Sequence, residues 1–91
     1  LNLSNMINLN FAFNRLACLK AETFLNMKNL AELLLSHNKI SHIESYAFKG
    51  LISLKYLDLK NNLIKNLNRE IFYELNSLNN LNLESNFIEE I

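Results

Sequence analysis

The sequence lacks most of the residues that usually make turns, covalent links and membrane spans. It has one glycine, no proline and one cysteine in 91 residues, so other residues must make the turns and no internal disulfide is possible. The sequence contains no run of about 18 apolar residues, so it predicts no membrane-spanning helix. Nine basic residues balance nine acidic ones, so no broad positive charge attracts nucleic acid or an anionic membrane surface.

Apolar residues and asparagine are abundant. A hydrophobic content of 49% with 20% charged residues is typical of a chain that folds. Asparagine tolerates left-handed backbone and bonds to nearby backbone groups, so it is expected to replace glycine and proline in the turns. The first residues have neither an initiator Met nor a signal-peptide pattern, and we expect the chain to be part of a longer protein.

A constant repeat length organises the chain. The same frame of leucines, one asparagine and two later apolar residues recurs in segments such as LAELLLSHNKISHI and LKYLDLKNNLIKNL. The repeated asparagines are Asn14, Asn38, Asn62 and Asn86, and the repeated phenylalanines are Phe24, Phe48 and Phe72. The period predicts one array, with complete units at 6–29, 30–53 and 54–77, a partial unit at 1–5 and a truncated unit at 78–91.

This frame resembles that of leucine-rich repeat proteins with 24-residue repeats. The type is common in extracellular proteins such as Toll-like receptors, Slit, chaoptin-like adhesion proteins, small proteoglycans and the acid-labile subunit of growth-factor carriers. The resemblance implies an α/β-type solenoid with one short parallel strand per repeat on a concave face. Irregular or short helical segments are expected on the convex side.

The framework positions have predicted structural roles. Alternation of Leu33 and Leu35 predicts a short strand with both leucines turned inward. Each repeated asparagine amide combines donors with an acceptor, which predicts hydrogen bonds to backbone groups of its own and adjacent units, forming a ladder. The phenylalanines are predicted to stack into an aromatic spine.

The outward positions between the framework residues are the candidate binding site. The family frame places them on the concave face, and the set of outward residues differs from one unit to the next. The candidates are Glu32, Leu34, Ser36, His37, Tyr56, Asp58, Lys60, Asn80, Asn82 and Glu84. Tyr56 and Leu34 beside charged residues suit recognition of a protein by an apolar anchor with a polar rim. For any single residue, an ordinary solvated position is the simpler interpretation.

No pattern predicts catalysis, a cofactor or a metal site. His37 and His42 are interpreted as surface histidines on which no cysteine or carboxylate set converges. Cys18 aligns with His42 in the repeat and is expected to be exposed or half-exposed, without a partner base. Gly50 is the only glycine, which excludes a phosphate-binding glycine loop. The scattered basic residues lead us to expect no nucleic-acid partner.

Three functional hypotheses remain open. The favoured one is a protein-binding module of an extracellular or cell-surface receptor or adhesion protein, with membrane contact only through another part of a longer chain. In that setting Asn2, which begins the tripeptide NLS, is a candidate for N-glycosylation. One alternative is a cytoplasmic leucine-rich repeat scaffold or regulatory subunit. The other is an innate-immune receptor ectodomain that recognises microbial lipid or nucleic acid.

Overall fold

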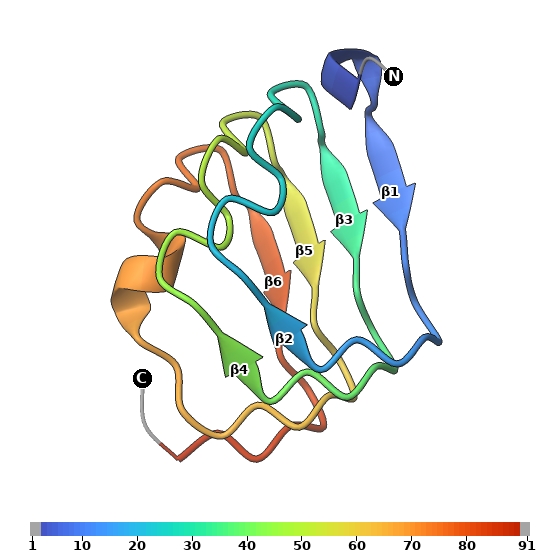
Figure 1. Cartoon of the computed structure of the whole chain (residues 1–91), viewed down its shortest axis with the longest axis vertical. Coiled ribbons are helices and arrows are strands. Elements are labelled where there is room, and N and C mark those ends of the chain that lie inside the picture. The colour runs from blue at the N-terminus through green and yellow to red at the C-terminus, as the bar shows by residue number, and fades with distance from the viewer. Residues whose placement is uncertain (1–2, 90–91) are drawn as a thin grey trace.

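The main sheet of the protein contains four parallel strands, one from each successive turn of the coil (Figure 1). The computed structural model describes residues 3–89. The strands are β1 (Asn8–Asn10), β3 (Glu32–Leu34), β5 (Tyr56–Asp58) and β6 (Asn80–Asn82), in that spatial order. They begin at equivalent positions of successive repeats and pair in register, so equivalent residues lie side by side. The solenoid predicted from the sequence is therefore confirmed.

A second parallel sheet lies across the coil from the main sheet (Figure 1). It pairs β2 (Cys18–Leu19) with β4 (His42–Ile43), with Cys18 opposite His42. We call it the outer sheet. The repeat pattern predicted one strand per unit and did not indicate this pairing. It forms because Leu19 and Ile43 are buried and hold their two turns in the same extended conformation.

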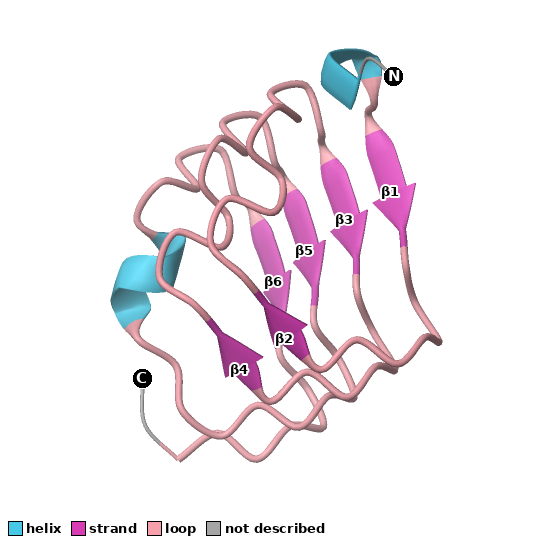
Figure 2. Cartoon of the chain, in the orientation of Figure 1, coloured by secondary structure: helices cyan, strands magenta, loops and turns pink. Residues whose placement is uncertain are grey.

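The remaining connections are mostly irregular (Figure 2). Two short 3-10 helices occur in the described part of the chain, η1 (Leu3–Asn5) and η2 (Arg69–Phe72). The Asn68 side chain caps η2 by accepting a hydrogen bond from the Glu70 N–H at 3.0 Å. On the side of the coil opposite the main sheet, η2 and irregular connections are found (Figure 2), which confirms the irregular or short helical segments expected there. Within residues 3–89, no helix is long and apolar enough to cross a membrane.

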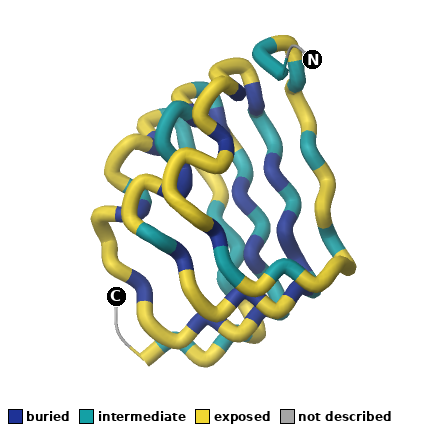
Figure 3. Tube along the Cα trace, in the orientation of Figure 1, coloured by how far each residue is buried: buried dark blue, intermediate teal, exposed yellow. Residues whose placement is uncertain are grey.

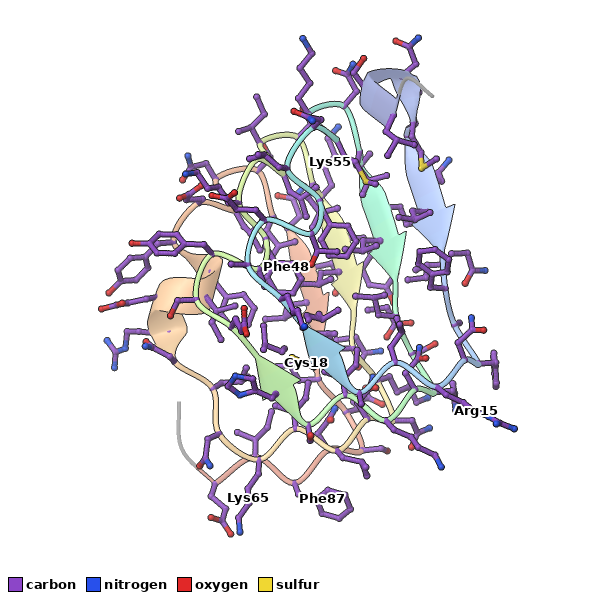
Figure 4. The ribbon with its side chains drawn as sticks, viewed as in Figure 1. Arg15, Cys18, Phe48, Lys55, Lys65 and Phe87 are labelled. Atoms are coloured by element: carbon purple, nitrogen blue, oxygen red, sulfur yellow. The ribbon has the colours of Figure 1, made fainter. Side chains whose placement is uncertain are left out.

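The core lies between the main sheet and the convex connections, and it is densest in the two middle turns (Figure 3). Leu33 and Leu35 are fully buried, which confirms the predicted inward alternation. Phe48, labelled in Figure 4, stacks between Phe24 and Phe72 with ring centroids 6.3 and 6.2 Å away. The predicted aromatic spine is therefore confirmed. Stacked pairs of this kind contribute about 0.5–1.5 kcal/mol each beyond their burial.

The repeated asparagines join each turn to the one before it. The Asn38 side chain accepts a hydrogen bond from the Leu16 N–H at 3.0 Å and donates to the Phe11 carbonyl at 2.9 Å. Asn62 and Asn86 make the equivalent bonds one and two turns later. Asn14, in the first turn, bonds to the carbonyls of Phe11 and Ala12 in its own unit. The ladder thus supplies partners for turn backbone that would otherwise be buried without them.

The turns after the main strands place a left-handed residue immediately before each ladder asparagine. These residues are Phe13, His37, Asn61 and Ser85, with φ between 55° and 61°. Asparagine takes this left-handed position at one of the four turns, as Asn61, and at all four turns it supplies the side-chain bonds of the ladder. Left-handed backbone costs roughly 1–2 kcal/mol for an ordinary residue. It is held here by bonds to the neighbouring turn, such as the His37 N–H to the Lys60 carbonyl at 2.9 Å.

Candidate functional site

The outward side chains of the main sheet form three rows that cross the strands. The first row is Asn8, Glu32, Tyr56 and Asn80, and the second is Asn10, Leu34, Asp58 and Asn82. The third row lies two residues beyond the ends of the strands and consists of Ala12, Ser36, Lys60 and Glu84. We call these twelve positions the concave face. Strand pairing thus brings nine of the ten sequence-predicted site residues together, with His37 at their edge.

The middle of the concave face combines apolar and charged groups. Tyr56 lies between Glu32 and Asn80 in its row, and Leu34 lies next to Asp58 in the second row. Tyr56 and Leu34 are both half-buried, so each leaves part of its apolar surface accessible to a ligand. Three carboxylates of the concave face, from Glu32, Asp58 and Glu84, accompany one lysine, Lys60.

The second row also shapes the turns. Asp58 accepts a hydrogen bond from the Lys60 N–H at 3.0 Å, and Asn82 accepts one from the Glu84 N–H at 3.0 Å. Asn10 makes the same contact with the Ala12 N–H at 2.9 Å. Asp58 and Asn82 therefore hold the chain where it leaves the strand. This role was not predicted from the sequence, although Asp and Asn side chains typically accept a hydrogen bond from the backbone two residues further on. Each retains further acceptor or donor capacity for a ligand.

Ser36 is not available in the way the sequence predicted. It was expected to face outward, but it is buried, with 7% of its surface exposed. Its short side chain lies in a row with a neighbouring turn on either side, so it does not project beyond the surrounding backbone. Ser36 contributes to the turn through its carbonyl, which accepts hydrogen bonds from Phe13 and Asn38.

His37 belongs to an aromatic pair at the edge of the concave face. Its ring stacks on Phe13 with centroids 4.3 Å apart and planes 5° apart. The Asn61 Nδ2 lies 3.4 Å from His37 Nε2. Phe13 is 76% exposed, and Arg15 and Lys39, two residues further along each turn, are exposed cations (Figure 4 shows Arg15 extending away from the ribbon). We call Phe13, Arg15, His37 and Lys39 the basic edge.

Comparison with known proteins identifies the fold family. The leucine-rich repeat family matches residues 28–88. The chain belongs to the leucine-rich repeat family. No curated protein matches the sequence.

One solved structure closely similar to this leucine-rich repeat chain is the crystal structure of the TLR13–ssRNA13 complex. The two share 34% sequence identity with a TM-score of 0.90, over 92% of this chain and 12% of the TLR13 chain. The resemblance to Toll-like receptors is thereby supported in three dimensions. Because that neighbour was solved with a single-stranded RNA, the match runs against our expectation that no nucleic acid is a partner.

The repeat also assembles a second cluster, on the outer sheet. The ligand atoms of Cys18, His42 and Glu44 all lie within 4.8 Å of one another. The prediction that no cysteine or carboxylate converges on a histidine is therefore wrong. The cause is the stacking of successive repeats, which places Cys18 beside His42. Cys18 is half-exposed, as expected.

The candidate glycosylation site lies outside the described residues. Asn2 precedes residue 3, where the described part of the chain begins. Ser4, the third residue of the tripeptide, is half-buried in η1, and its carbonyl accepts a hydrogen bond from Asn29 at 2.7 Å. Modification at Asn2 therefore stays a prediction.

Proposed function

We propose that this chain is a recognition module of an extracellular or cell-surface receptor and that its concave face binds a protein ligand. The observation that carries the proposal is the contrast between the two sides of the main sheet. The inward side repeats leucine in every turn. The outward residues change over the first three turns, and the fourth turn repeats the two asparagines of the first but has Glu84 in place of Ala12. A uniform scaffold that displays a non-uniform surface is the arrangement expected of a binding array.

The composition of the concave face favours a protein over a polyanion. Tyr56 and Leu34 provide apolar anchors of the kind that dominate protein interfaces, and the charged residues beside them provide a rim. Glu32, Asp58 and Glu84 repel phosphate groups, and Lys60 is the one cation of the concave face that offsets them. A ligand with a basic rim around an apolar centre matches this pattern.

The size of the face sets the scale of the contact. Four strands about 4.8 Å apart and about five residues of about 3.3 Å each give a projected area of roughly 300 Å². A standard interface uses about 800 Å² on each partner. A stable complex through this face therefore also uses surface beyond these four turns, in keeping with the 12% of the TLR13 chain that this chain spans. The proposed role is binding, without enzymatic chemistry.

Site-specific cross-linking in the full protein tests this proposal. Tyr56 is replaced by a photo-reactive phenylalanine derivative in protein expressed on the cell surface, and adducts are analysed after irradiation. We expect one discrete protein adduct, which disappears when Asp58→Ala or Leu34→Ala is added. Tyr73, exposed on the convex side after η2, is the matched control position.

The outcomes separate the alternatives. The same adduct from positions 56 and 73 would show non-specific contact and refute a binding concave face. An adduct found only on protein retained in the cytoplasm would favour the intracellular scaffold. Loss of the adduct with Asp58→Ala supports the proposal only if the circular dichroism of the variant is unchanged. This control is needed because Asp58 also accepts the hydrogen bond from the Lys60 N–H that holds the turn.

A second candidate function is supported by the basic edge and by the TLR13–ssRNA13 complex. Exposed Phe13 stacked with His37 provides a platform for a nucleobase, and Arg15 and Lys39 are placed to meet phosphates. Stacking of a base on an aromatic side chain is worth about 1–3 kcal/mol. On this alternative the chain recognises single-stranded RNA at the edge of the sheet, away from the three carboxylates.

RNA binding is tested by fluorescence anisotropy with a short labelled single-stranded RNA. Phe13→Ala is expected to weaken binding by about tenfold, the loss of roughly 1.4 kcal/mol of stacking. Arg15→Ala should lower the slope of log affinity against log salt by about 0.7, as expected for one lost phosphate contact. Lys28→Ala, which replaces an exposed lysine in the connection before β3, is the control. Equal effects of Lys28→Ala and Arg15→Ala would refute a site at the basic edge.

A further inference from the structure

The outer sheet carries a group of side chains that the proposed function does not use. Cys18 and His42 are register partners in β2 and β4, so their side chains leave adjacent strands in the same direction. Glu44 lies two residues beyond His42 and therefore on the same face. Their ligand atoms lie within 4.8 Å of one another. Figure 4 shows Cys18 on β2, across the coil from the main sheet.

We propose that Cys18, His42 and Glu44 form a zinc site with three protein ligands and an open fourth position. Thiolate, imidazole and carboxylate are the three side-chain ligands that zinc takes in proteins. A sulfur and a nitrogen ligand disfavour magnesium and calcium, which prefer oxygen. The donor set therefore points to a borderline-soft divalent ion.

The spacing of the three ligand atoms suits tetrahedral zinc. Bonds of about 2.3 Å to sulfur and about 2.0–2.2 Å to nitrogen and oxygen place tetrahedral ligand atoms about 3.4–3.6 Å apart. Separations of up to 4.8 Å leave about 1 Å to close. We expect rotation of the exposed His42 side chain and the half-buried Cys18 side chain to close it.

Glu44 is already oriented for this role. Its Oε1 accepts a hydrogen bond from the Ala21 N–H at 2.9 Å, and its own N–H donates to the Leu19 carbonyl at 2.9 Å. These two contacts fix the residue to the preceding turn and leave Oε2 for a metal ion. Ligand carboxylates in metal sites are typically held by such outer hydrogen bonds.

A surface hollow beside the cluster provides room for the fourth ligand. It is lined by His42, Ile43, Glu44, Ser45, Asn66 and Asn68. Asn66 takes the place in its turn that Cys18 and His42 take in theirs. The open position therefore faces solvent and a polar wall, where water or a side chain of another molecule completes the coordination.

Zinc at this position links two successive units. Cys18 belongs to the unit at 6–29, whereas His42 and Glu44 belong to the unit at 30–53. On binding, the Cys18 thiol gives its proton to the buffer and the thiolate bonds to the metal. A bound ion therefore stabilises the outer side of the coil between these two units.

Metal titration of the full chain under reducing conditions tests the site. Cobalt(II) is used as a spectroscopic substitute for zinc, because thiolate bonded to cobalt gives charge-transfer absorption in the near ultraviolet. We expect one equivalent of cobalt to produce this absorption and one equivalent of zinc to abolish it. Cys18→Ser should remove the absorption, and His42→Gln and Glu44→Gln should each weaken zinc binding at least about tenfold.

His37→Gln is the matched control, because His37 is the other histidine of the chain and lies in the basic edge, stacked on Phe13. It should leave metal affinity unchanged. Absence of binding at one equivalent of either metal overturns the proposal. Binding that survives Cys18→Ser also overturns it, and so does a loss of affinity in His37→Gln equal to that in His42→Gln. Circular dichroism of each variant verifies that the fold is intact, and neither result depends on the concave-face ligand.

Discussion

Replacement of Asn62 by leucine tests the asparagine ladder where it is most buried. Asn62 is 3% exposed and accepts a hydrogen bond from the Ile40 N–H at 3.0 Å. It also donates to the carbonyls of Leu35, Leu59 and Lys60. Each of these carbonyls keeps a second donor, from Asn38, Asn86 and His37 respectively. Within residues 3–89 the Ile40 N–H has no other acceptor, so Asn62→Leu leaves it unpaired in a fully buried position.

The expected loss of stability in Asn62→Leu comes mainly from the unpaired Ile40 N–H. An unpaired buried N–H costs about 1–3 kcal/mol, and the lost amide bonds add a net cost of about 0.5–1.5 kcal/mol. We therefore expect Asn62→Leu to lower the free energy of unfolding by about 2–4 kcal/mol. Asn38→Leu should cost more than about 1 kcal/mol but less than Asn62→Leu, since the Leu16 N–H that it orphans is half-buried and reachable by water. Asn14→Leu, at an exposed turn, should cost less than about 1 kcal/mol.

Urea unfolding followed by circular dichroism measures this order, and hydrogen exchange of the Ile40 amide reports the local effect. One kcal/mol corresponds to about 4–8 °C in melting temperature for a domain of this size. Equal midpoints for Asn62→Leu and Asn14→Leu, or an Ile40 amide that stays protected in Asn62→Leu, would refute the reasoning.

Three further outcomes are expected. Gly50→Ala should destabilise the protein by about 2 kcal/mol or more, because a Cβ at Gly50 would lie 2.3 Å from the Leu25 carbonyl oxygen and φ is +94°; an unchanged urea midpoint would contradict this. Phe48→Ala should cost about 3–5 kcal/mol, and the half-buried Phe72→Ala less; the reverse order in urea would refute the central position of Phe48 in the spine. Protein from a eukaryotic secretory host should lose mass on glycosidase treatment, and Asn2→Gln should abolish the loss; no mass change would exclude glycosylation.

The sequence predicted what depends on the period of the repeat. Leu33 is buried and Phe48 is stacked because the constant repeat length places every framework side chain beside its equivalents. The same regularity aligned Glu32 with Tyr56 on the concave face. These features follow from register alone, so one correct alignment of the units gives all of them.

What the sequence did not predict depends on how far a side chain reaches. Ser36 occupies an outward position but is too short to emerge from between its neighbours. Asp58 has the right position for a ligand and is also used to hold its turn. Cys18 and His42 were aligned correctly, yet their convergence with Glu44 required the pairing of β2 with β4, which no hydrophobic alternation indicated.

The direction of the asparagine ladder has a consequence for synthesis of the protein. Asn38 and Asn62 each bond to backbone groups of the unit before their own. A unit that has just left the ribosome therefore lacks the amide that completes its turn until the equivalent part of the next unit has been made. At about 5–20 residues per second that delay is about 1–5 s per unit. The newest turn is always incomplete during translation, so the array closes one unit behind the growing end.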